Sequence, residues 1–346
     1  MTIYNGITEL VGQTPLLRLN GFSQQFTLQA ELVAKLEYFN PNHSSKDRIA
    51  LAMIEAAERD GRLRPGMTLV DTTSGNTGIA LAAIAAAKGY KFRVYLHDKL
   101  SAERFAILTA FGAEIVPFSQ VEGFDNVIEE SDGDFVAAAR WLAANVILKQ
   151  PNICFTCQLE NPVNPDAHYR HTGPEIWQQT GGHIDLLIAS VGTGGTLSGA
   201  GRYLKQHSPS IQLIGVEPGS HSIPGPDNPD RREITGVHAF HDVAPERVPP
   251  TLDRTLVDDV FAVESWQAIQ TAREVAASDG ILVGESSGAV LFAAREIARR
   301  PENAGKRIVV ILADSGLTYL STGLFDPRLT IPQIEAAQKP AYVSAV

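Results

Sequence analysis

Short apolar runs alternate with helix-length segments along nearly the whole chain. In the first half, Thr68–Thr72, Phe92–His97 and Glu114–Phe118 have the length and composition of buried strands. Between them, the alanine-rich Gly78–Lys88 and the amphipathic Ser101–Phe111 are predicted as helices. Strands that alternate with helices indicate an α/β fold with mainly parallel sheets.

The alternation continues in the second half, so two layered sheets fit the pattern best. The length agrees, because a chain of 346 residues exceeds the size at which a single hydrophobic core stops growing. The strands predicted in this half are Ile184–Val191, Ile211–Glu217, Leu256–Val263 and Arg307–Ala313, and the helices are Leu197–Gln206, Ser265–Ala277 and Ala289–Arg299.

Three stretches depart from this alternation. Gln120–Asp134 is acidic and contains glycine, so it is predicted as a surface loop or insertion. Gly219–Pro250 is rich in Pro, Gly and His and is too long for a plain connection, so we expect it to be either functional or disordered. The residues after Asp326, with a helical fragment at Gln333–Ala337, are expected to form a surface extension.

The formal net charge of -10 argues against a nucleic-acid partner, since Arg231–Arg232 and Arg299–Arg300 are too short to form a basic face. No stretch reaches the roughly 20 apolar residues of a membrane span. The N-terminus also lacks the pattern of a signal peptide. We therefore expect a cytoplasmic protein that binds neither nucleic acid nor membrane.

The two cysteines, Cys154 and Cys157, form a CxxC pair inside the apolar run Ile153–Leu159, which is predicted as a strand. In a strand, residues three apart face opposite sides. A redox CxxC site instead lies at a helix N-terminus, and a zinc site needs more ligands than two. We expect neither a redox role nor a metal site here.

A glycine-rich loop, made of Gly192, Thr193, Gly194, Gly195 and Thr196, lies between a predicted strand and a predicted helix. In such a loop the backbone N–H groups and the helix N-terminus bind phosphate, and threonine hydroxyls add donors. The loop lacks the lysine of a Walker loop and the spacing of a dinucleotide site. By itself, the pattern fits a structural turn equally well.

Lys46 is predicted to open a helix that ends near Gly61, with Ser44 or Ser45 as the N-cap. A lysine cation at this place opposes the helix macrodipole. Most lysines are simply exposed, but a lysine held as a neutral imine avoids that cost. A lysine with a lowered pKa is also a usable nucleophile and base.

The loop Thr73–Gly78 joins a predicted strand to a predicted helix and offers a second anion site, rich in hydroxyls. If phosphate occupies the glycine-rich loop, this second loop can hold the α-carboxylate of an amino acid. Asn76 could reach a phenolic oxygen. A capped loop without a ligand is the structural alternative. Together, the imine-forming lysine and the two anion loops are the parts of a pyridoxal 5'-phosphate (PLP) enzyme.

Several segments resemble the cysteine synthase family, which includes cystathionine β-synthase and has PLP fold type II. The resemblance runs from about Ile7 to Phe325, with the segments in the family's order and spacing. It is strongest to members of the O-acetylserine sulfhydrylase type. The segments are Asn40–Arg48, Thr73–Gly78, Thr172–Ile176, Gly192–Thr196, Gly284–Gly288, Asp314–Gly316 and Tyr319–Thr322.

The resemblance implies two doubly wound, three-layer α/β/α domains of the tryptophan-synthase-β type, with the cofactor in the cleft between them. Residues 1–40 and 151–330 would form the larger, PLP-binding domain, and residues 41–150 a smaller, mobile, substrate-binding domain. Residues 331–346 would form a C-terminal surface tail. The family is commonly homodimeric, and we expect the same here.

The resemblance also implies roles for individual residues. Lys46 would link covalently to the cofactor, Asn76 would bind its ring oxygen, and Ser286 would face its pyridine nitrogen. A neutral hydroxyl makes the ring a weaker electron sink than a carboxylate would, which favours loss of a β-substituent. Gly192, Thr193, Gly194, Gly195 and Thr196 would bind the phosphate, and Thr73, Ser74, Thr77, Gln158 and Gly236 the substrate.

The implied reaction is a β-replacement on O-acetylserine or O-phosphoserine. Lys46 would remove the α-proton and help expel the leaving group, leaving a bound α-aminoacrylate. Addition of sulfide would give L-cysteine, and another nucleophile a different β-substituted alanine. The alternatives are β-elimination or dehydration of serine or threonine and, more remotely, a non-catalytic partner protein that kept the fold.

Three positions depart from the family pattern near the expected entrance for substrate. Asn42-His43 replaces smaller residues, Glu285 replaces an apolar residue, and the loop at Gly236 contains His238. Either these are neutral changes, or His43, His238 and Glu285 select a different nucleophile, such as an amine. Arg231 and Arg232 could recognise an acidic substrate, although we expect exposed arginines here.

Overall fold

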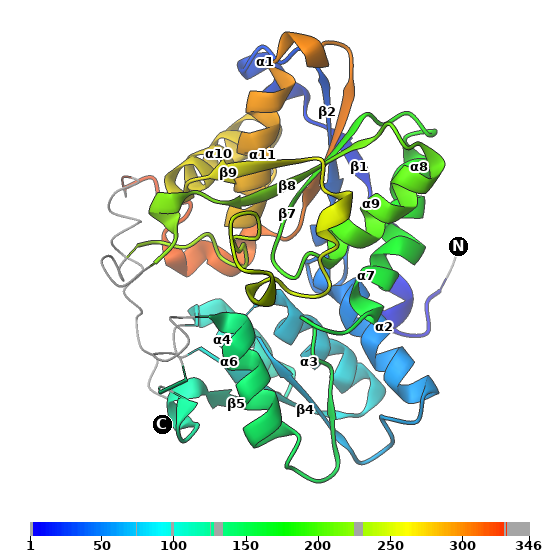
Figure 1. The fold of residues 1–346 in the computed structure, drawn as a ribbon, viewed down its shortest axis with the longest axis vertical. Helices are drawn as coiled ribbons and strands as arrows, with labels where there is room; N and C mark the ends of the chain where they lie inside the picture. The colour runs from blue at the N-terminus through cyan, green and yellow to red at the C-terminus, as the bar shows by residue number, and fades with distance from the viewer. Residues whose placement is uncertain are drawn as a thin grey trace.

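A computed structural model describes residues 3–73, 75–97, 100–124, 126–127, 134–224, 231–328 and 330. The strands in these residues form a six-stranded and a four-stranded sheet. Figure 1 shows the two sheets in separate lobes, with the first strands of the chain in the same lobe as the last. The expected α/β class with two parallel-stranded sheets is confirmed.

The larger sheet is parallel apart from its edge strand β1, which runs antiparallel to β2. Helices α1, α10 and α11 pack against one face and α8 and α9 against the other, giving three layers. In sheet order the strands are β1 (Leu16–Arg18), β2 (Glu31–Leu36), β10 (Arg307–Leu312), β7 (Leu186–Ser190), β8 (Gln212–Pro218) and β9 (Asp259–Val263). The helices are α1 (Asn20–Gln25), α8 (Gly173–Gln179), α9 (Gly195–His207), α10 (Ser265–Asp279) and α11 (Glu285–Ala298).

The smaller sheet is parallel throughout, and it is also covered on both faces. Helices α2, α3 and α4 pack against one face, and α6 packs against the other. In sheet order the strands are β5 (Glu114–Pro117), β4 (Lys91–Leu96), β3 (Thr68–Thr72) and β6 (Ile153–Phe155). The helices are α2 (Lys46–Arg59), α3 (Asn76–Lys88), α4 (Ala102–Ala110) and α6 (Phe135–Leu142).

The predicted strand Ile153–Leu159 is wrong in its second half. β6 ends at Phe155, and Cys157 adopts a left-handed conformation with φ of 53°. The chain turns there, because the backbone N–H groups of Glu160 and Asn161 both donate to the Cys157 carbonyl. Since β6 pairs with β3, the smaller sheet includes residues beyond position 150, where we placed the domain boundary.

Other boundaries differ in smaller ways. β9 begins at Asp259 rather than Leu256, because a 3₁₀ turn at Arg254–Leu256 precedes it. Strands β1 and β2 were not predicted. The predicted helical fragment at Gln333–Ala337, the tail 331–346 and parts of the loops Gln120–Asp134 and Gly219–Pro250 lie outside the described residues. Among the helices that are described, none combines the length and the apolar character needed to cross a bilayer.

Candidate active site

The carboxyl ends of the two parallel sheets face one another, and the loops that follow the strands meet there. Asn76, after β3, donates from Nδ2 to Oδ2 of Asp314, after β10, at 2.7 Å. Ser44, after β2, forms an antiparallel bridge with Asp314. Ligands of parallel α/β sheets bind beyond the carboxyl ends of the strands, so this is the expected place for a site.

Lys46 is the first residue of α2 and is half-buried. Its Nζ lies 3.5 Å from Oγ of Ser45. Burial lowers the pKa of its ammonium group, against the opposing effect of the Asp314 and Glu37 carboxylates. Ser45 is the N-cap of α2, which is one of the two serines expected there, but its side chain makes no capping bond. Instead, Ser44 Oγ accepts a bond from the Lys46 N–H at 3.3 Å.

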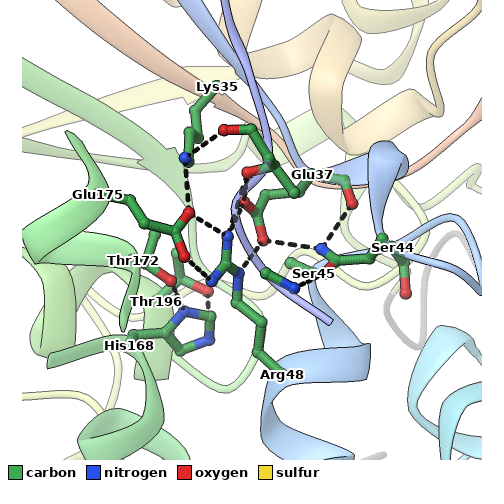
Figure 2. Close-up of polar contacts among 12 residues, drawn as sticks. Lys35, Glu37, Ser44, Ser45, Arg48, His168, Thr172, Glu175 and Thr196 are labelled. Carbon is green, nitrogen blue, oxygen red and sulfur yellow. Dashed lines mark hydrogen bonds and ion pairs between the residues drawn. The ribbon is translucent and has the colours of Figure 1, made fainter. Parts of the chain in front are cut away.

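Next to Lys46 lies a buried ion cluster of Lys35, Glu37, Arg48 and Glu175 (Figure 2). The Arg48 guanidinium bonds both carboxylates, with Nε–Oε2 (Glu37) and Nη1–Oε1 (Glu175) distances of 2.7 Å. Burial would raise the pKa of Glu37, but Arg48 and Lys35 outweigh it and bring this pKa to about 2. The cluster ties the first turn of α2 to β2 and α8.

The glycine-rich loop connects β7 to α9, as predicted, and three of its residues have no room for a side chain. A Cβ on Gly192 would lie 2.4 Å from the Gly236 carbonyl oxygen, and one on Gly195 would lie 2.0 Å from Oδ1 of Asn164. Gly194 has φ of 81°, which favours glycine. The loop thus presents bare backbone at a helix N-terminus, which is the form of a phosphate site.

Two buried side chains on the segment before α8 hold this loop, and the sequence analysis missed both. Asn164 donates from Nδ2 to Thr193 Oγ1 at 3.0 Å. The Nε2 atom of His168 lies 3.1 Å from Thr196 Oγ1. Burial, aided by the Arg48 charge, lowers the pKa of His168 to about 3, so its imidazole is neutral. The signal available in the sequence was the four-residue spacing of these two polar side chains.

Ser286 lies in the first turn of α11, and only 8% of it is exposed. Its hydroxyl has no hydrogen-bond partner among the described residues. The hydroxyl is therefore free to bond a ligand. Asp314 lies beside this turn, because Gly284 donates from its N–H to the Asp314 carbonyl at 3.3 Å.

The expected substrate residues are partly brought together. Thr77 donates from Oγ1 to Gln158 Oε1 at 2.6 Å, which leaves the Gln158 amide N–H groups for another acceptor. Thr73 Oγ1 accepts from the Gly75 N–H at 3.3 Å. Gly236 adjoins the glycine-rich loop through the close approach of its carbonyl to Gly192. Ser74 lies outside the described residues.

The three candidate specificity residues have different surroundings. His43 is exposed, with Nδ1 3.3 Å from the Tyr38 carbonyl. His238 is half-buried, and burial lowers its pKa to about 4. Glu285 is buried in an ion pair with Arg232 and accepts from Thr235 Oγ1 at 3.1 Å.

The expectation of an exposed Arg232 is therefore wrong, because its side chain is only 1% exposed. The specificity roles of His43, His238 and Glu285 stay predictions.

Cys154 lies in β6, and Cys157 lies in the turn after this strand. Both are free thiols, and burial raises the pKa of each, that of Cys157 to about 12. Thiolate is the reactive form, so these thiols are held in their unreactive state at neutral pH.

A family model for pyridoxal-phosphate dependent enzymes matches residues 7–314. The chain belongs to this family. It is 41% identical over 320 residues to cystathionine β-synthase of Oryctolagus cuniculus, with 92% of this chain and 56% of that protein covered. It is 40% identical over 326 residues to cysteine synthase 3 of Caenorhabditis elegans, with 93% and 90% covered. This PLP enzyme thus spans little more than half the length of the cystathionine β-synthase.

Solved structures agree with this assignment. The structure of an O-ureido-L-serine synthase is 34% identical with a TM-score of 0.77, and 94% of this chain and 96% of that chain are covered. A cysteine synthase from Entamoeba histolytica is 34% identical with a TM-score of 0.79, at 97% and 96% coverage. The enzyme therefore has the fold type II architecture of the cysteine synthase and cystathionine β-synthase group, and its cofactor is PLP.

The side chains of this PLP enzyme fit the cofactor. The bare backbone at Gly192–Thr196 matches a phosphate, and the free hydroxyl of Ser286 matches a ring nitrogen. Lys46 is half-buried with a lowered pKa, as a lysine that binds a carbonyl compound requires. Asn76 has one amide N–H engaged with Asp314, and its second N–H can donate to a phenolic oxygen.

Proposed function

We propose that the enzyme replaces the β-substituent of an O-activated L-serine, such as O-acetylserine or O-phosphoserine, with a nucleophile. The default nucleophile is sulfide, which gives L-cysteine. The observation that carries the proposal is the position of Ser286, whose hydroxyl has no partner among the described residues, in the first turn of α11. The names of the relatives, cysteine synthase and O-ureido-L-serine synthase, are consistent with chemistry at the serine β-carbon.

When bound, PLP withdraws electrons from the substrate's α-carbon and so stabilises negative charge there. Ser286 would offer a neutral hydroxyl to the ring nitrogen of bound PLP, and unlike a carboxylate it would not hold a proton on that nitrogen. This limits the stabilisation, so a substrate that can expel a good leaving group from its β-carbon is favoured. Transamination, which needs longer-lived charge, is disfavoured.

Lys46 acts as the general base and acid. Because burial lowers the pKa of its ammonium group, a larger fraction of the amine is unprotonated near neutral pH than for an exposed lysine. Its Nζ removes the α-proton, and it returns a proton to the same carbon when the product forms. The nearby Asp314 and Glu37 carboxylates favour the protonated form after the first step.

Thr73, Ser74, Thr77 and Gln158 are proposed to hold the substrate's α-carboxylate. The Thr77–Gln158 bond fixes the amide of Gln158 with its N–H groups available as donors. Replacing Thr77 with valine should raise KM for O-acetylserine about 10-fold while PLP binding is unchanged, because an amide that can rotate binds the carboxylate less well. Steady-state kinetics and a PLP titration on the same variant separate the two effects.

The test of the reaction is made without a nucleophile. The holoenzyme is mixed with O-acetylserine, O-phosphoserine or serine, and released acetate or phosphate is measured against enzyme concentration. We expect one equivalent of leaving group, no pyruvate, and further turnover only when sulfide is added. Continuous release of a 2-oxo acid would instead establish β-elimination, the second candidate.

A matched variant checks the role of Lys46. Lys46→Ala should bind PLP without a reducible covalent link, so borohydride followed by mass spectrometry should label the wild type and not this variant. Release of leaving group at the wild-type rate by Lys46→Ala would contradict the role of Lys46.

We also propose that the enzyme is a cytoplasmic homodimer. Leu282, Leu317 and Leu320 support an interface, since they are 39%, 50% and 52% exposed. The Gly316 N–H donates to the Leu282 carbonyl, which brings these leucines together. Light scattering coupled to size exclusion gives the oligomeric state, and cell fractionation gives the location.

A further inference from the structure

The glycine-rich loop Gly192–Thr196, the proposed phosphate site, rests on a buried polar stripe formed by Asn164, His168 and Thr172. These residues recur every four positions along α7 (Val163–Ala167) and the π-helical turn η5 (His168–Thr172), and none is more than 1% exposed. His168 is the centre of the stripe. Its Nδ1 lies 2.9 Å from Thr172 Oγ1 and its Nε2 lies 3.1 Å from Thr196 Oγ1 (Figure 2).

Close helix packing makes this contact possible. A Cβ on Gly199 of α9 would lie 2.0 Å from the Pro165 carbonyl oxygen and 2.8 Å from Cβ of His168. A Cβ on Gly173 would lie 2.7 Å from Cβ of Tyr203, on the same face of α9. The missing side chains let the segment approach α9 closely enough for His168 to reach Thr196. The π-helical turn is itself a feature found often at functional sites.

A neutral imidazole has one N–H donor and one acceptor, so two arrangements are possible. In the first, Thr196 donates its hydroxyl proton to Nε2, so this proton cannot bond any other acceptor. In the second, Thr172 donates to Nδ1, Nε2–H donates to Thr196, and the Thr196 proton remains available. A phosphate at the glycine-rich loop accepts hydrogen bonds only, so it selects the second arrangement.

We propose that His168 is a positioning residue for the phosphate of PLP, which donates from Nε2–H to Thr196 Oγ1 and thereby directs the Thr196 hydroxyl proton to that phosphate. His168 acts through Thr196 and does not touch the cofactor. The inference rests on the proposed binding of phosphate at Gly192–Thr196.

Two variants at position 168 separate the two ends of the ring. The glutamine side-chain nitrogen can take the place of Nε2, whereas an asparagine is shorter and reaches only the position of Nδ1. PLP is removed from the holoenzyme, and its dissociation constant is measured by titration. His168→Asn should weaken PLP binding about 10- to 100-fold, the scale of a hydrogen bond to a charged group, and His168→Gln should stay near wild type.

Thr196 provides the check on mechanism. If His168 acts through the Thr196 hydroxyl, His168→Asn should have no further effect in a Thr196→Val background. The ³¹P shift of the bound phosphate should move in His168→Asn and not in His168→Gln. In the wild-type holoenzyme, ¹⁵N shifts should show a proton on Nε2 and none on Nδ1.

Equal weakening by both His168 variants, or by neither, overturns the proposal, and so does a proton found on Nδ1. Thermal unfolding of each variant is also measured without PLP. An equal loss of stability in the two His168 variants would show a purely structural role and would also overturn the proposal. Failure of the wild type to bind PLP is a different result, because it removes the proposed phosphate site itself.

Discussion

The buried ion cluster next to Lys46 contains two cations and two carboxylates. A network of ion pairs centred on Arg48 joins Lys35, Glu37 and Glu175. The Arg48 side chain is only 2% exposed. Burial alone would disfavour each charge, and the mutual bonds offset that cost. Removing one member leaves uncompensated charge in the interior.

Arg48→Met should therefore lower the free energy of unfolding by about 3–5 kcal/mol, because Glu37 loses its main partner. Urea denaturation followed by circular dichroism measures the change. The matched control is Arg18→Ala, which removes an exposed ion pair with Glu31 and should cost less than about 1 kcal/mol. Equal effects from the two substitutions would contradict the assigned role of the cluster.

At Asp47, beside Lys46, burial outweighs the groups that would stabilise the charged carboxylate. Burial raises its pKa to about 7, although the Asn42 N–H donates to its Oδ2 at 2.7 Å. The folded state therefore keeps a proton on Asp47 that the unfolded chain has already lost. Asp47 therefore does not affect the free energy of unfolding below about pH 4, and it lowers this free energy increasingly as the pH rises to about 7.

Asp47→Asn should remove this cost, because the amide oxygen still accepts from Asn42 and carries no charge. The free energy of unfolding of this variant should exceed that of the wild type by about 1–4 kcal/mol at pH 8, with no gap at pH 4. Denaturation curves across this pH range measure the gap. A gap that is constant with pH would show that Asp47 titrates normally.

At the scale of elements, the close contact between α9 and the α7–η5 segment positions the glycine-rich loop. Gly199→Ala should lower the free energy of unfolding by about 1–3 kcal/mol, because its new Cβ would collide with the backbone at Pro165. Gly6→Ala is the control, since a Cβ there meets nothing nearer than 3.9 Å. Thermal unfolding compares them, and equal melting temperatures would contradict the packing argument.

Elements that follow a simple pattern were predicted well. Thr68–Thr72 was predicted with its observed bounds, because five residues bounded by polar turns are typical of a buried parallel strand. β2 was missed because Glu31 and Lys35 interrupt its apolar pattern. Lys35 is fully buried only because Glu175, Gln179 and the Thr14 carbonyl bind its ammonium group. That compensation comes from residues distant in sequence.

At the scale of the whole molecule, the proposed cofactor contacts belong to both sheets. Lys46 and Asn76 begin helices that cover the smaller sheet, while Thr196 and Ser286 lie in the first turns of helices that cover the larger sheet. Bound PLP should therefore link the two lobes.

Removal of PLP with hydroxylamine should lower the melting temperature, because a ligand that binds only the folded state stabilises it by mass action. Differential scanning calorimetry of both forms measures this, and we expect one transition with PLP and a broader or split transition without it. Addition of PLP should restore the first curve. Identical curves would show that the cofactor does not link the lobes.

The sequence by itself determined the α/β class, and it predicted Lys46, the loop Thr73–Gly78 and the glycine-rich loop Gly192–Thr196 as parts of a site. Local composition is enough to indicate these features, since strand-to-helix turns rich in glycine or hydroxyls present N–H and O–H donors that can bind anions. Tertiary structure decided what surrounds them: the pairing of Glu285 with Arg232, the bond from Asn76 to Asp314, and the support of Thr196 by His168. Such contacts join residues from separate segments, so burial and hydrogen bonding there depend on how the two sheets and their helices pack.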